Sequence, residues 1–149
     1  MADKLQQAGW QPDYGPAQPH KTAGCAVIGA RPPLIAFNVN LNTTNVEIAQ
    51  NIARRIRHSN GGLRFCKAMG VSLGVHNLAQ VSMNLTNYRQ TSIYQAVELI
   101  KIEATRYGVT VAGSELIGML PLEAVTDCAA YYLGLDDFGP NRILEANFD

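Results

Sequence analysis

Polar side chains occupy alternate positions in two segments that contain no charged residue, 34–41 and 77–87. These side chains are Asn38, Asn40, Gln80, Ser82 and Asn84. Successive side chains of a β-strand point to opposite faces, so each set shares one face of its strand. A sheet face that only meets water normally carries Lys, Glu and Thr. We therefore expect this amide-rich face to be covered.

The amide groups themselves indicate the kind of ligand that such a face binds. An amide both donates and accepts hydrogen bonds, so a row of amides suits a flat, neutral heteroaromatic ring such as a pterin or a purine. An analogue that lacks a matching group leaves a buried amide unpaired, at a cost of about 1–3 kcal/mol. The alternative is that a second domain or subunit covers the face and that the amides bond only to it.

Other chemically capable residues form weaker patterns. The histidines have no nucleophile or carboxylate at a diagnostic spacing; they are His20, His58 and His76. The segment Gly24–Arg31 lacks both the third glycine of a dinucleotide fingerprint and the Gly-Lys-Ser/Thr of a phosphate-binding loop. Together with Gly15 and Pro16 it is typical of a Gly/Pro-rich loop whose backbone can approach a ligand closely. The sequence thus predicts no catalytic residue.

The composition excludes several classes of protein. A chain of 149 residues with 47% hydrophobic residues is long and apolar enough to form one folded domain. Its 12 Lys and Arg balance 12 Asp and Glu, and the polar face lacks stacking aromatic side chains, which argues against nucleic acid as a partner. No apolar run is long enough for a membrane span or a signal peptide. The 3 cysteines lie far apart, which predicts a reducing, cytoplasmic location and no metal site.

The pattern of apolar residues predicts an α+β fold. The expected elements are a strand at 34–41, a helix at 45–58 that begins with a capping box at Thr44–Glu47, strands at 64–74 and 77–86, a helix capped by Ser92 and ended by Gly108, a strand at 109–113 and a helix from Pro121 to Leu133. This order is that of a ferredoxin-like βαββαβ sandwich with an added C-terminal helix. We expect both sandwich helices on one face of the sheet, against Ile35, Phe37, Val39 and Leu41.

The predicted organisation has two parts. Residues 1–33 are rich in Gly and Pro and should form an irregular segment with a ligand-contacting loop. Residues 34–149 should form the folded subdomain.

Several long motifs, in order along nearly the whole chain, resemble those of one family. They are Lys4–Pro16, Gly29–Arg31, Leu34–Leu41, Asn77–Ser82 with Asn84–Leu85, and Gly113–Gly118 with Pro121–Leu122. Through these motifs the chain resembles the glutamate formiminotransferases, which also occur as the transferase part of formiminotransferase cyclodeaminase. That family transfers a formimino group from formiminoglutamate to tetrahydrofolate in histidine degradation.

The resemblance implies that this chain is the C-terminal one of two α/β subdomains, between which the folate lies. It implies a folate-binding role for a loop and for the amide-rich face, whose residues are Gly15, Pro16, Ala17, Gln18, Pro19, His20, Lys21, Thr22, Ala23, Gly24, Asn38, Asn40, Gln80 and Asn84. The family's catalytic histidine belongs to the N-terminal subdomain, so this chain alone should be inactive. The implied partners are tetrahydrofolate as a substrate, formiminoglutamate, the N-terminal subdomain and further copies of the chain, without a metal.

The sequence therefore leaves two hypotheses. The first is the folate-binding half of a glutamate formimidoyltransferase, a folate-dependent one-carbon transferase. The second is a non-catalytic ferredoxin-like interaction module whose amide-rich sheet face is a subunit interface. They differ in one observable property, because an interface protein self-associates or pairs without any folate present.

Overall fold

The computed structural model describes residues 2–148. The chain divides into two compact units, Met1–Arg31 and Pro32–Asp149. In the first unit a short helix, α1 (Ala2–Leu5), precedes an irregular segment. The expected irregular segment therefore contains one helical turn, and the rest of it has no helix or strand among the described residues.

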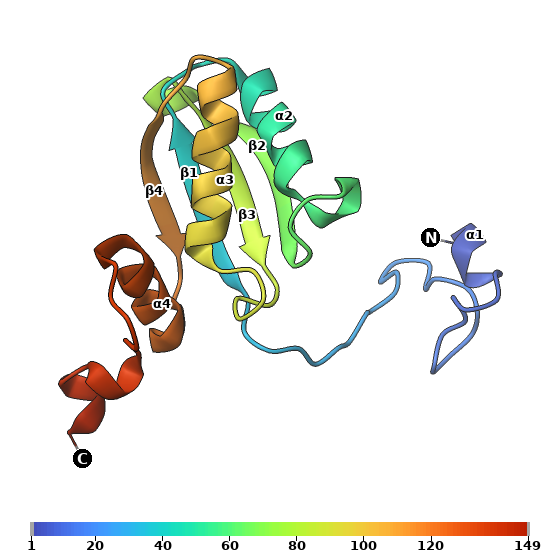
Figure 1. Ribbon diagram of the computed structural model, residues 1–149. Helices are drawn as coiled ribbons and strands as arrows, with labels where there is room; N and C mark the ends of the chain where they lie inside the picture. Colours follow the sequence, from blue (N-terminus) through green and yellow to red (C-terminus); the bar gives the residue numbers. More distant parts are fainter. Residues whose placement is uncertain (1, 149) are drawn as a thin grey trace. The chain divides into compact units, whose positions relative to one another are not determined.

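The second unit contains the predicted βαββαβ order with one further helix. Its strands are β1 (Ile35–Leu41), β2 (Cys66–Leu73), β3 (Leu78–Leu85) and β4 (Val111–Ile117), and its helices are α2 (Val46–Ile56), α3 (Ile93–Arg106) and α4 (Leu122–Leu133). The strands form one sheet in the order β2-β3-β1-β4, and every neighbouring pair is antiparallel. The α+β, ferredoxin-like fold predicted from the sequence is thus confirmed (Figure 1).

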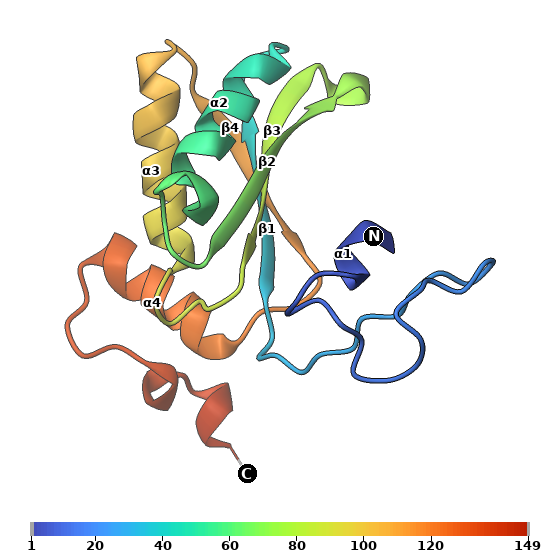
Figure 2. The same cartoon turned by 90° about the vertical axis from the view of Figure 1, so that its right-hand side faces the viewer.

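Helices α2 and α3 both lie on one face of the sheet (Figure 2). That face contains the core, in which Ile35, Val39 and Leu41 of β1 are fully buried against residues such as Ile52 and Ile100 of the helices. The predicted core face of the first strand is confirmed, with Phe37 only partly buried at its edge. The alternation that buries these residues leaves the amides of β1 on the helix-free face.

Helix α2 approaches β2 very closely. A Cβ atom added to Gly70 would overlap the backbone of Ala49 and Gln50 on α2. This contact depends on the absence of a side chain at Gly70, and it fixes the distance between helix and strand.

The predicted start of α2 differs from the structure, whereas that of α3 is confirmed. Helix α2 begins at Val46, and its cap is Asn45, whose side chain accepts a 3.0 Å hydrogen bond from the backbone N–H of Glu47. The predicted capping box that begins at Thr44 is therefore wrong by one residue. Ser92 caps α3 as predicted, in a reciprocal capping box with Gln95.

The fourth strand also differs from its prediction. It was expected to end near residue 113, but β4 extends to Ile117. This extension adds residues to the sheet next to β1, and it changes the chemistry of the helix-free face.

Candidate functional site

The helix-free face of the sheet holds a row of polar side chains across β3, β1 and β4, which we call the polar row: Gln80, Asn40, Asn38 and Glu115. Asn40 pairs with Gln80 across β1 and β3, and Asn38 pairs with Glu115 across β1 and β4. Although this face carries no helix, Asn38 is only 8% exposed and Gln80 only 4%. Neighbouring atoms therefore fix the orientation of these two amides, which do not rotate freely in water.

Glu115 joins the amides into one hydrogen-bonded network. Its Oε2 accepts from Asn38 Nδ2 at 3.3 Å and from Gln80 Nε2 at 3.4 Å. Gln80 Nε2 also donates to Asn40 Oδ1 at 2.8 Å. Glu115 itself is exposed, so the carboxylate can hold the two amides and still accept hydrogen bonds from a ligand.

Charged residues from β2 and β4 correct the expectation of a charge-free face. The two segments used for that expectation are indeed uncharged, but the strands beside them bring Glu115 opposite Asn38 and Lys67 opposite Asn84. The face therefore offers mixed acceptors and donors with one carboxylate among the amides.

A bulge in β4 determines which side chain joins the row. The register of β4 against β1 shifts so that Ala112 is an extra residue in the strand. A bulge of this kind reverses which side chains face each side of the sheet beyond it. With regular pairing Ser114 would lie opposite Asn38, whereas the bulge puts Glu115 there.

Beyond the polar row, the helix-free face has apolar ends. Met69 lies opposite Ser82 and is 60% exposed, and Ile117 lies opposite Ala36 and is 49% exposed. Large apolar side chains at both ends of a polar row favour a covered face over one exposed to water. Asn84 lies on the same face, two residues along β3 from Ser82.

The loop at residues 15–24 belongs to the first unit and forms a closed turn of its own. His20 and Gly24 exchange two backbone hydrogen bonds of 3.0 Å. His20 Nδ1 also accepts from the backbone N–H of Ala23 at 3.2 Å and of Thr22 at 3.4 Å. Gly24 has a φ of +70°, which a residue with a side chain adopts only with strain. His20 therefore shapes the loop through Nδ1.

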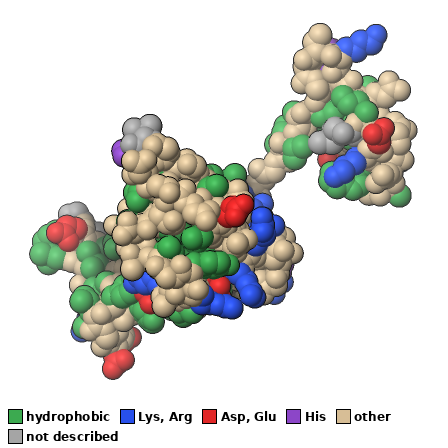
Figure 3. All heavy atoms as spheres, turned by 90° about the horizontal axis from the view of Figure 1, so that it is seen from above, with side chains coloured by type: hydrophobic (Ala, Val, Ile, Leu, Met, Phe, Trp, Pro, Cys, Tyr) green, Lys and Arg blue, Asp and Glu red, His purple; other side chains and the backbone are tan. Residues whose placement is uncertain are grey.

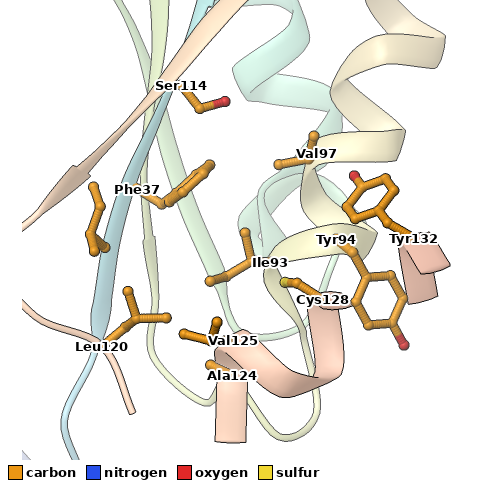
Figure 4. A pocket seen from close by; sticks show the side chains of 11 residues that line it. Phe37, Ile93, Tyr94, Val97, Ser114, Leu120, Ala124, Val125, Cys128 and Tyr132 are labelled. Carbon is orange, nitrogen blue, oxygen red and sulfur yellow. The ribbon is translucent and has the colours of Figure 1, made fainter. Parts of the chain in front are cut away.

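An apolar groove of about 340 Å³ lies on the other side of the sheet. Phe37 of β1 lies on one side, and Ile93 and Val97 of α3 lie across from it with α4 below (Figure 4). Leu116 of β4 also lines the groove. Polar groups in it are few, chiefly the Ser114 hydroxyl and the tyrosine rings. The groove lacks a charged group and is a poor candidate for acid–base chemistry.

Helix α4 is tied to the turn before α3 by one carboxylate. Glu123 Oε2 accepts from Arg89 Nε at 2.9 Å and Nη2 at 2.8 Å, and from the Tyr88 hydroxyl at 3.0 Å. The Arg89 hydrogen bond, followed by that of Tyr88, holds the pKa of Glu123 below its usual value.

We expect Arg89→Met to raise the pKa of the Glu123 carboxyl toward its ordinary value. Because the folded-state pKa is lowered, this contact contributes fully above the ordinary glutamate range and is lost as pH falls through the lowered value. A carbon-detected NMR titration of the Glu123 carboxyl measures the change. Arg106→Met, which removes the ion pair with Glu103, should leave Glu123 unaffected, and equal pKa values in wild type and Arg89→Met would contradict the assignment.

The remaining reactive groups are poor catalysts. All three cysteines are free thiols, and burial raises the pKa of Cys66 to about 11, which keeps it protonated. Among residues 2–148 no three His, Cys, Asp or Glu side chains are grouped as a metal site. No helix in the described part of the chain is long and apolar enough to cross a membrane. In Figure 3 several acidic and basic side chains lie next to one another on the visible face of the second unit.

Comparisons with known proteins agree on one family. A family model described as formiminotransferase domain matches residues 36–139. The chain is similar to the glutamate formimidoyltransferase of Streptococcus pyogenes serotype M1, with 53% identity over 97% of this chain and 49% of that protein. Its identity to the glutamate formimidoyltransferase of Thermoplasma acidophilum is 48%, over 100% of this chain and 49% of that protein.

A longer relative gives the same result. The formimidoyltransferase-cyclodeaminase of Rattus norvegicus is 40% identical over 89% of this chain and 25% of its own length. The chain thus spans about half the length of the first two relatives and a quarter of the third.

Proposed function

The chain belongs to the formiminotransferase domain family, and from this we propose that it is the folate-binding half of a glutamate formimidoyltransferase, acting in the cytoplasm in histidine degradation. The reaction moves a formimino group from the nitrogen of formiminoglutamate to a nitrogen of tetrahydrofolate. A bond forms between the folate nitrogen and the formimino carbon, the bond from that carbon to the glutamate nitrogen breaks, and glutamate leaves with a proton on its amine.

The polar row is the observation that carries this proposal. Two nearly buried amides, Asn38 and Gln80, lie beside Asn40 and an exposed carboxylate on the helix-free face. A pterin ring is flat and has both donors and acceptors on its edge, so it matches this set of groups. Asn84, one row away, extends the same surface.

The loop at residues 15–24, in the first unit, is proposed as a further folate-contacting segment. It comprises Gly15, Pro16, Ala17, Gln18, Pro19, His20, Lys21, Thr22, Ala23 and Gly24. Its backbone is closed by the His20–Gly24 pair, so a ligand meets a loop that is already shaped. Residues 1–33 then act as the ligand-contacting segment and residues 34–149 as the subdomain that carries the polar row.

The catalytic groups come, in this proposal, from an N-terminal subdomain. The chain spans about half the length of the two glutamate formimidoyltransferases, and the apolar side chains of Met69 and Ile117 make the helix-free face suitable for contact with another subdomain. The transfer needs no metal, and tetrahydrofolate takes part as a substrate.

Isothermal titration with 5-formyltetrahydrofolate tests the proposal. We expect weak binding to the chain alone and tighter binding once it is mixed with the portion of the Streptococcus pyogenes relative that the chain does not match. The control for nonspecific pairing is the other portion of the same relative, namely the part that the chain does match. Absence of binding even with the complementary portion would overturn the proposal.

The interaction module is the second candidate, because the apolar ends of the helix-free face also suit a protein interface. Sedimentation velocity without folate distinguishes the two. A purely structural module pairs or self-associates fully without ligand, and added folate leaves its sedimentation and its unfolding temperature unchanged. A folate-dependent rise in the unfolding temperature favours the transferase half.

A further inference from the structure

The carboxylate of Glu115 fixes which way the neighbouring amides point. A carboxylate only accepts hydrogen bonds, so the amide atoms that face it must be the nitrogens of Asn38 and Gln80. Since Gln80 Nε2 also faces Asn40, the Asn40 atom there must be its oxygen. The nitrogen of Asn40 is thereby left as a donor on the far side of its amide group. One charge thus sets the polarity of three amides.

An open notch lies beside this network. Gly113 is opposite Asn40 and two residues before Glu115, so all three share the helix-free face. A Cβ atom added at Gly113 would meet none of the described atoms within 4 Å. Asn40, whose amide nitrogen is a donor, and Glu115, whose carboxylate accepts, are therefore the neighbours of this notch on the helix-free face.

We propose that Glu115 and Asn40 recognise the 2-amino-4-oxopyrimidine edge of the pterin ring at the Gly113 notch. This assignment rests on the proposed function and names the atoms that select its ligand. The edge presents two adjacent donors, the 2-amino group and N3–H, followed by one acceptor, O4. A carboxylate accepts from the donor pair in a two-point contact, and Asn40 Nδ2 donates to O4.

This recognition makes a specific prediction about a close analogue. In lumazine the 2-amino group is replaced by a carbonyl oxygen, which would face a carboxylate oxygen without a proton between them. Wild type should therefore bind 6-methylpterin at least about tenfold more tightly than 6-methyllumazine. Glu115→Gln should lose most of this preference, because its amide nitrogen can donate to the lumazine carbonyl.

The experiment is a fluorescence titration with each pteridine, at a pH where lumazine is neutral. The sample is the full chain mixed with the complementary portion of the Streptococcus pyogenes relative. Glu47→Gln, the same change at an exposed carboxylate of α2, should keep the wild-type preference. Gly113→Val should weaken binding of both pteridines, because its side chain occupies the notch, where an added Cβ atom meets none of the described atoms within 4 Å.

A measurement without ligand tests the orienting role separately. The side-chain NH₂ resonances of Asn38 and Gln80 should shift in Glu115→Gln and stay in place in Glu47→Gln. Unchanged resonances would overturn the network, and an unchanged pterin preference in Glu115→Gln would overturn the assignment. If 5-formyltetrahydrofolate still binds in that case, the proposed function stands; if wild type binds no folate with the complementary portion, both proposals fall.

Discussion

The chain by itself is expected to release no measurable glutamate from formiminoglutamate in the presence of tetrahydrofolate. The polar row can hold a ring, but Glu115 is its single carboxylate, and it is engaged with Asn38 and Gln80. A transfer without a covalent intermediate depends mainly on positioning, which supplies about 7–11 kcal/mol of barrier lowering. At about 1.36 kcal/mol per factor of ten, losing half of the site removes roughly five to eight powers of ten in rate.

Mixing with the complementary portion of the Streptococcus pyogenes relative should restore release of glutamate, measured by amino-acid analysis over time. That portion alone is the matched control and should also be inactive. Release by the unmixed chain at a rate close to that of the mixture would contradict the division of the site between two subdomains.

Gly70→Ala is expected to destabilise the fold by about 3 kcal/mol or more, the upper range for overpacking. The added Cβ would overlap backbone atoms of Ala49 and Gln50, and a backbone contact cannot be relieved by rotating a side chain. Either α2 moves away from β2, which opens the core at Ile52, or the strand shifts out of register. Urea unfolding followed by circular dichroism measures the change.

Gly74→Ala provides a matched control in the same hairpin. A Cβ at Gly74 would meet none of the described atoms within 4 Å, and its φ lies outside the left-handed region. Its effect on the free energy of unfolding should stay within about 0.5 kcal/mol. Equal losses in the two variants would show that the close approach of α2 is not what requires glycine at position 70.

The elements that sequence could predict are those defined by local patterns. Alternation in β1 identified Val39 as buried and Asn38 as its opposite, because the two-residue period of a strand is independent of its neighbours. Ser92 at the start of α3 and Gly108 after its end were predicted from capping chemistry, and both are confirmed.

The features that could not be predicted from sequence depend on pairing with a distant strand or on a choice between two similar neighbouring residues. Thr44 and Asn45 are both good caps, and only the structure shows that Asn45 is the one that bonds the helix start. Glu115 was missed because its place depends on the register between β4 and β1, which the Ala112 bulge shifts. A single extra residue within one strand does not change the alternation of residue types along the sequence in a recognisable way.

The strand order has a consequence for the order in which the protein is made. Strand β1 lies between β3 and β4, so Val39 pairs with Val81 on one side and Ser114 on the other. During synthesis β1 leaves the ribosome before the other three strands of the sheet. Its edge toward β4 stays unpaired until β4 has been made. Strand β4 also brings Glu115, which completes the polar row. Until β4 has paired, the nascent chain therefore lacks its complete ligand surface and exposes the unpaired, aggregation-prone edge of β1.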